Sequence, residues 1–208
     1  MKIVCISDTH GLHKSLSLPK GDMIIHAGDV TNRGEKHEVV DFLNWFKALD
    51  FKHKIFIAGN HDFFFEKASP EEIEELIPSS IIYLNDSGIT IEGINIWGSP
   101  VQPWFYDWAF NRQRGEEIQK HWDKIPEETD ILITHGPAYE VLDLTNKNEA
   151  VGCENLLNTI KKIKPKVHLA GHIHEAYGTT KKFGVDFINA SVLNIRYEVK
   201  NAPITIAY

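Results

Sequence analysis

The sequence predicts an α/β fold in which two β-sheets pack face to face and helices cover their outer sides. The chain has 208 residues, of which 42% are hydrophobic and 25% are charged, a composition typical of a globular domain with a sizeable core. Its elements run β-α-β, then a β-rich middle, a second β-α-β unit and further strands. Two packed sheets account for this order better than one doubly wound sheet. With no linker or repeat, we expect residues 1–208 to form one domain.

The first half of the chain predicts three strands and two helices. Three apolar runs have the composition of buried strands: residues 2–7, 22–27 and 54–58. Between the last two strands, four apolar side chains recur at helical spacing: Val39, Leu43, Phe46 and Leu49. A second, short helix begins at Ser69-Pro70, where Glu72 would complete a capping box, and it ends before Pro78.

The second half predicts a hairpin, two helices and more strands. Residues 81–97 alternate short apolar segments with turn signals at 86–88 and 92–93. An aromatic-rich loop covers 98–111, and a helix follows it to about Trp122. Three further segments complete the pattern: a strand at 130–134, a helix bearing Leu156, Ile160 and Ile163, and a strand at 167–170. The tail, residues 176–207, is typical of strands and turns.

Five of the predicted strands end in side chains that can bind a metal ion. They are Asp8 with His10, Asp29, Asn60 with His61, His135, and His172 with His174. Ligands gather at the carboxyl ends of strands in open α/β sheets, so we expect these groups to converge. The set exceeds the needs of one ion and suffices for two, with Asp29 as the natural bridge. Nitrogen and oxygen donors without thiolate favour Mn, which we prefer, or Fe, Zn or Co over Ca or Mg.

A pair of divalent ions indicates phosphoester hydrolysis. Two ions about 3.5–4 Å apart convert a bridging water to hydroxide and hold the phosphate oxygens during in-line attack. His61 adjoins Asn60 and cannot easily reach the same ion, so we predict that it donates a proton to the leaving group. Asp62 would fix the tautomer of His61 or cap the following turn. Arg33 and His13 are candidate substrate-binding residues.

The ordered motifs resemble those of the calcineurin-like metallophosphoesterases. The blocks are D-x-H at residues 8–10, G-D at 28–29, G-N-H-D at 59–62, His135, and G-H-x-H at 171–174. Residues 108–111, 134–137 and 171–175 are also similar to a small subgroup of brain metallophosphoesterase-domain proteins and their bacterial relatives.

This resemblance implies a four-layer α/β/β/α sandwich with a dinuclear metal centre. One ion would bind Asp8, His10, Asp29 and His174; the other would bind Asp29, Asn60, His135 and His172. His61 would assist the leaving group. Some animal members of the subgroup have a glycine in place of one G-H-x-H histidine and are weak enzymes. This chain keeps both histidines, which implies an active catalyst.

Other polar and aromatic residues receive structural interpretations. We predict that His37, His53 and His121 are solvated, and that His26 and His168 are hydrogen-bonded core residues. His26 could also support a ligand. Asn189 and Ser191 are candidates to reach the site, for which the sequence gives no geometry. The aromatic segment 104–110 has two open interpretations: a hydrophobic plug under the middle strands, or a wall on which a nucleobase stacks.

The function we predict is hydrolysis of small phosphodiesters, such as cyclic nucleotides or aryl phosphodiesters, a preference that rests on the resemblance alone. A phosphomonoesterase and a non-catalytic binding scaffold remain alternatives. The net charge of −7 and the lack of a basic stripe disfavour long nucleic acid as a partner. No apolar run is long enough to span a membrane. Two cysteines, Cys5 and Cys153, are too few for a disulfide framework, so we expect free thiols and a cytoplasmic location.

Overall fold

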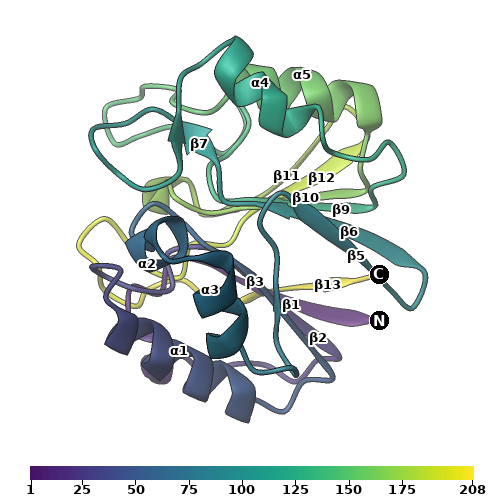
Figure 1. The fold of residues 1–208 in the computed structure, drawn as a ribbon. Coiled ribbons are helices and arrows are strands. Elements are labelled where there is room, and N and C mark those ends of the chain that lie inside the picture. The colour runs from purple at the N-terminus through teal and green to yellow at the C-terminus, as the bar shows by residue number, and fades with distance from the viewer.

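The protein consists of two stacked β-sheets between two layers of helices (Figure 1). The structure is a computed structural model and describes all residues from Met1 to Tyr208. In Figure 1, α4 and α5 lie above the sheets and α1 lies below them; the apolar side chains of α2 and α3 join the core under α1. The predicted four-layer α/β/β/α arrangement is therefore confirmed. No helix is both long enough and apolar enough to cross a bilayer.

The first sheet has the strand order β13-β1-β2-β3-β4. The neighbours from β1 to β4 are parallel, and β13 is antiparallel to β1. Its strands are β1 Lys2–Ile6, β2 Met23–Ala27, β3 His53–Ile57, β4 Ile82–Tyr83 and β13 Ile204–Ala207. The helices on its outer face are α1 Lys36–Ala48, α2 Phe63–Lys67 and α3 Pro70–Leu76.

The second sheet has the order β11-β12-β10-β9-β6-β5, with parallel pairs from β12 to β6. Its strands are β5 Ser87–Ile91, β6 Ile94–Ser99, β9 Ile131–Thr134, β10 Val167–Ala170, β11 Gly178–Lys182 and β12 Val185–Asn189. Helices α4 Glu116–Trp122 and α5 Glu154–Ile163 cover its outer face, and β7 Gln102–Pro103 pairs with β8 Asn111–Arg112 beside it.

Three apolar layers follow from the alternation of side chains along each strand. In β1, Ile3 and Cys5 face the core between the sheets, whereas Val4 and Ile6 face the core under α1. A third core lies between the second sheet and helices α4 and α5. Because both faces of each sheet are covered, the central strands are continuous apolar runs, which is why they are easy to predict.

The sequence predicted the start of α3 correctly but placed the capping box at the wrong helix. Ser69 caps α3 by accepting a hydrogen bond from the Glu72 backbone N at 3.2 Å, with Pro70 in the first turn. The reciprocal capping box occurs instead at α1, between Glu35 and Glu38. Helix α2 was not predicted, because its Phe-Phe-Phe sequence has no helical periodicity. In the structure Phe65 is buried in the core, and Phe63 and Phe64 pack against that core.

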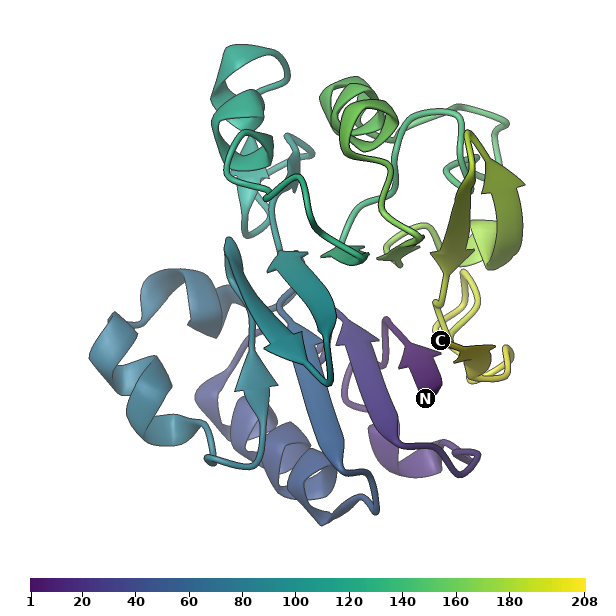
Figure 2. The same cartoon turned by 90° about the vertical axis from the view of Figure 1, so that its right-hand side faces the viewer.

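The two sheets are joined where β1 and β12 end. Ser7 pairs with Ser191, so that Ser7 N donates to Ala190 O at 2.9 Å and Val192 N donates to Ser7 O at 3.0 Å. The chain ends also meet, since Tyr208 N donates to Met1 O at 2.9 Å (Figure 2). The seam at Ser7 and Ser191 brings loops from both sheets to one place.

Phe42 on α1 is fully buried and packs against Phe46, Phe56 and His26. We expect Phe42→Ala to lower the free energy of unfolding by about 3–5 kcal/mol, because it leaves a cavity in this core. Denaturant unfolding measures the effect. Val40→Ala, on the exposed side of the same helix, serves as the control. A loss below about 1 kcal/mol for Phe42→Ala would contradict the packing described here.

Candidate metal centre

The side chains predicted as metal ligands converge beside the seam between the sheets. The side chains form three sets, and within each set the ligand atoms lie within 4.8 Å of one another. The sets are Asp8, His10 and His174; His10, Asp29 and His61; and Asp29, His135 and His172. Asn60 joins the third set, since its Oδ1 lies 2.9 Å from His135 Nε2. The sets overlap at His10 and Asp29, so all seven predicted ligands belong to one cluster.

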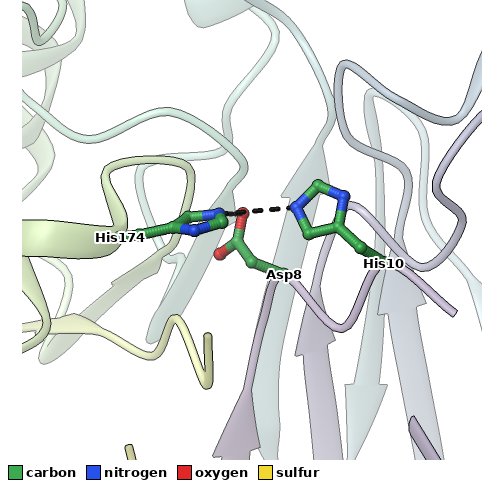
Figure 3. A group of neighbouring side chains, drawn as sticks. All are labelled: Asp8, His10 and His174. Atoms are coloured by element: carbon green, nitrogen blue, oxygen red, sulfur yellow. Dashed lines mark hydrogen bonds and ion pairs between the residues drawn. The ribbon is translucent and has the colours of Figure 1, made fainter. Parts of the chain in front are cut away.

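The first set surrounds the carboxylate of Asp8, with His10 and His174 turning ring nitrogens toward it from two sides (Figure 3). His174 Nε2 lies 3.5 Å from Asp8 Oδ1 and 3.4 Å from His10 Nε2. Asp8 Oδ2 accepts a hydrogen bond from the Ser191 hydroxyl at 2.7 Å. Ser191 therefore reaches the cluster, where it orients the carboxylate of Asp8.

Asp29 lies between the other two sets. Its Oδ2 is 3.5 Å from His10 Nε2 and 3.4 Å from His135 Nε2, so one oxygen faces two imidazoles. Its Oδ1 accepts a hydrogen bond from the His61 backbone N at 2.8 Å. This is the position that a carboxylate shared between two ions would occupy.

Backbone carbonyls fix the tautomers of three histidines. The Nδ1 atoms of His135, His174 and His61 lie 2.9, 3.0 and 2.7 Å from the carbonyl oxygens of Ala27, Asn194 and Asn32. A carbonyl can only accept, so each Nδ1 carries the hydrogen. In the neutral rings of His135 and His174, Nε2 therefore presents a lone pair to the cluster, which is how metal-binding histidines are oriented.

The spacing of the donor atoms fits bound cations. Donors about 2.1 Å from one ion lie about 3.0 Å apart in octahedral geometry and about 3.4 Å apart in tetrahedral geometry. The distances between neighbouring donors here run from 2.9 Å for His135 and Asn60 to 3.5 Å for His174 and Asp8. A metal pair would also satisfy the requirement that buried carboxylates be paired with positive charge.

The backbone at the cluster adopts conformations that side chains rarely take. Asp8, His10, Asp29 and His172 have φ values of 56°, 42°, 56° and 68°. Left-handed backbone costs non-glycine residues about 1 kcal/mol or more each, and such residues concentrate at functional sites. The backbone at Gly171 lies so close to the residues after β1 that a Cβ there would collide with Ser7 Oγ and Asp8 Oδ2.

Two buried histidines support the loops that carry the ligands. His26 Nε2 pairs with the hydroxyl of Thr9, the residue between Asp8 and His10, at 2.9 Å. His168 Nε2 pairs in the same way with Thr134, which precedes His135, at 2.8 Å. Both histidines are hydrogen-bonded core residues as predicted. Asn189 also supports the site, since its amide donates to Ile173 O at 2.8 Å.

His61 is held between two aromatic rings. It stacks on Trp108 with a centroid distance of 4.2 Å and an interplanar angle of 28°, and its edge meets His10 at 4.5 Å. Both expectations for Asp62 are wrong. Its carboxylate neither contacts the His61 ring nor caps α2. It accepts hydrogen bonds from Val30 N, Thr31 N, the Thr31 hydroxyl and Gly59 N. Asp62 therefore ties the loops after β2 and β3 together.

The two predicted substrate-binding residues lie in different surroundings. Arg33 is exposed, and its backbone N donates to Glu38, one residue from the Asn32 carbonyl that holds His61. The structure does not bring His13 to the cluster. Its ring is buried against Phe42 and Trp45 and pairs with Asp41 of α1 at 3.3 Å.

Of the three histidines that we predicted to be solvated, one is exposed to solvent. His37 is exposed. His53 is half-buried and lies 3.3 Å from Glu92. The prediction that His121 is solvated is wrong, because its Nδ1 pairs with Asp86 at 2.5 Å and its Nε2 accepts a hydrogen bond from Arg112 at 3.2 Å. Helical position alone could not show these partners, which come from distant segments.

The aromatic segment divides between the two interpretations offered for it. Ala109 and Phe110 are buried in the core under α1, as a plug would be. Trp108 instead stacks on His61, and Phe105 lies with its ring centroid 6.3 Å from that of His172. The segment therefore forms both part of the core and part of the wall beside the cluster.

Tyr197 is a neighbour of the cluster that the sequence did not reveal. Its ring lies 4.8 Å from that of His10 and 5.3 Å from that of His174. It belongs to a turn built by Asn194, whose side chain accepts from the backbone N of Arg196 and of Glu198. No motif marks this turn, and it reaches the cluster only because β12 joins the first sheet at the seam.

Charges in the cluster shift the titration of its histidines. Burial disfavours the imidazolium of His135, but the carboxylates of Asp29 and Asp8 outweigh burial and raise its pKa from 6.5 to about 9. Burial is likewise outweighed by Asp8 at His174, where the pKa is also about 9. Burial opposes ionisation of Asp29 too, yet His135 and His10 hold its pKa well below the usual range.

These shifts predict how pH affects the metal-free protein. A histidine whose pKa rises on folding stabilises the fold below pH 6.5, and this contribution is lost as pH rises through about 9. We expect the unfolding midpoint of EDTA-treated protein to fall between pH 7 and pH 9, as thermal unfolding would show. His135→Asn should flatten the profile. A midpoint that rises over this range would contradict the prediction.

A four-layer sandwich that gathers carboxylate, amide and imidazole donors at joined strand ends is the arrangement expected of a metal-dependent phosphoesterase. The model of the calcineurin-like phosphoesterase family matches residues 1–176, and the chain belongs to that family.

Individual relatives agree with the family. The chain is 41% identical to metallophosphoesterase domain-containing protein 1 of Homo sapiens, over 99% of this chain and 70% of that protein. It is 26% identical to a probable glycerophosphodiester phosphodiesterase of Arcobacter nitrofigilis, over 86% of this chain and 74% of that one. The crystal structure of the protein TT1561 of Thermus thermophilus has the same fold, with a TM-score of 0.57 at 11% identity and coverage of 90% and 88%.

Proposed function

We propose that this protein hydrolyses small phosphodiesters at a pair of divalent cations, with manganese the preferred metal. The observation that carries the proposal is the sharing of one Asp29 oxygen between His10 and His135, each with further donors beside it. Asp8, His10, Asp29 and His174 would hold one ion, and Asp29, Asn60, His135 and His172 the other. Bound there, the ions would activate a water and neutralise charge on the phosphate oxygens.

His61 is the proposed proton donor to the leaving group. Its Nδ1 hydrogen is committed to Asn32 O, so donation from Nε2 requires that both ring nitrogens carry hydrogens. Stacking on Trp108 and the contact with His10 restrict the ring, so that Nε2 stays directed at the cluster.

The preference for diesters has support from one relative. The protein of Arcobacter nitrofigilis that is similar to this chain is named as a probable phosphodiesterase of glycerophosphodiesters. We carry over the reaction type, a phosphodiester cleaved to a monoester and an alcohol, and not its substrate.

Two chromogenic substrates test the proposal. With added manganese, we expect turnover of bis(p-nitrophenyl) phosphate to exceed that of p-nitrophenyl phosphate at equal concentration. Faster monoester turnover would indicate a phosphomonoesterase. If metal-loaded protein hydrolysed neither ester, a binding scaffold on the same fold would replace the enzyme. Degradation of single-stranded DNA or RNA with a steep salt dependence would indicate a nuclease instead.

A further inference from the structure

A pocket next to the candidate metal centre has no part in the roles described so far. Its volume is about 190 Å³, and the ring of His172 forms part of its wall. Other parts of the wall are Trp104, Phe105, Pro137 and Val151. Because His172 also belongs to the set with Asp29 and His135, the pocket and the candidate centre share one side chain.

The aromatic wall of this pocket is exposed but held in place. Trp104 and Phe105 are 52% and 50% exposed, which is unusual for such large apolar side chains. Their backbone is fixed, since Trp104 N donates to Arg112 O at 2.9 Å and the buried Asn111 amide donates to Phe105 O at 3.2 Å. The surface that they present is therefore formed before any ligand arrives.

The one charged residue that lines the pocket offers no free charge. Arg114 lines the pocket, but its guanidinium donates to Val151 O at 2.8 Å and to Gly152 O at 2.7 Å, and it also pairs with Glu154. Its charge is compensated, and its role is to hold the 151–154 backbone against α4. A pocket with aromatic and aliphatic walls favours an uncharged, flat group over a phosphate.

We propose that this pocket binds the ester group that stays on phosphorus during hydrolysis, and that it selects an aromatic ring there. The inference rests on the proposed function. A phosphate held at Asp29 and His135 would direct its leaving group toward His61 and its second ester group past His172. A cavity of about 150 Å³ holds benzene, so this pocket has room for one ring. Phe105 is placed to contact that ring and Val151 to limit its size.

Two substrates with the same leaving group test the pocket: p-nitrophenyl phenyl phosphate and p-nitrophenyl methyl phosphate. For the manganese-loaded protein, we expect kcat/KM to be at least about tenfold higher for the phenyl ester. Phe105→Ala removes the ring of the aromatic wall that lies beside His172, and Val151→Phe fills the pocket from a half-buried position. Either variant should bring the ratio to within about threefold. Tyr106→Ala, at a 74% exposed neighbour outside the pocket, should keep the wild-type ratio.

Binding of inert probes provides a readout that needs no turnover. Phenylphosphonate should bind the manganese-loaded protein at least about tenfold more tightly than methylphosphonate by calorimetry, and Val151→Phe should abolish the difference. Equal binding of the two probes, or a substrate ratio unchanged in both pocket variants, would overturn the inference and leave the proposed function standing. If neither diester were hydrolysed, the proposed function would fall and the phosphonates would still decide on the pocket.

Discussion

His61→Ala is expected to lower kcat by about 10²–10⁴-fold while leaving metal binding intact, because a general acid contributes on that scale. The substitution removes the ring that stacks on Trp108 and retains the backbone N that donates to Asp29 Oδ1. Steady-state kinetics and metal content by plasma mass spectrometry measure the two effects. His37→Ala, at an exposed histidine on α1, is the control.

The leaving group provides a sharper test of the role of His61. A proton donor matters most when the departing oxygen is basic, so the defect should be large for an alkyl leaving group and smaller for p-nitrophenolate. Equal defects for both would assign His61 to phosphate binding. Loss of metal from His61→Ala would make it a ligand, which its place within 4.8 Å of the His10 and Asp29 donors makes a meaningful alternative.

Asp29→Asn is expected to lose both activity and metal. The amide keeps the shape of the side chain but removes its negative charge. The carboxylate oxygen Oδ2, which lies near both His10 and His135, is then no longer available to two ions. The same charge raises the pKa of His135, so the variant should also show a weaker fall in apo stability at alkaline pH.

Metal-induced stabilisation measures the loss at Asp29. A ligand at about 100 times its Kd stabilises the folded state by about 2.7 kcal/mol, which is readily seen as a shift in the unfolding midpoint. We expect wild-type protein to show such a shift with manganese and Asp29→Asn to show little. Asp107→Asn, at an exposed acid in the aromatic segment, should behave as wild type. Full metal occupancy in Asp29→Asn would rule out Asp29 as a shared ligand.

The sequence was most informative where chemistry and periodicity coincide. Strand ends such as Ile6 to Asp8 or Ala27 to Asp29 combine a buried apolar run with a polar residue at its end. The seven side chains predicted from such patterns lie together in one cluster. Helix α2 lacked such a pattern, since three consecutive phenylalanines suit a strand as well as a helix.

The partners of those donors could not be predicted in the same way. The sequence suggested Asp62 as the group that fixes the tautomer of His61, but the backbone carbonyl of Asn32 does so. Every residue has a backbone carbonyl, so the identity of residue 32 does not indicate this role. Tyr197 and Asn194 reach the cluster through the return of the chain at Ser191. Their sequence neighbours, Arg196 and Glu198, resemble those of any solvated turn.

The bridge between Ser7 and Ser191 predicts an order for folding and metal binding. A nascent chain that has emerged only as far as Gly184 already contains all seven donors, from Asp8 to His174. It still lacks the hydroxyl that orients Asp8, the carbonyl that holds His174 and the β12 strand through which the sheets are joined. If the cluster binds cations as proposed, we therefore expect tight binding only after the segment that follows Gly184 has docked.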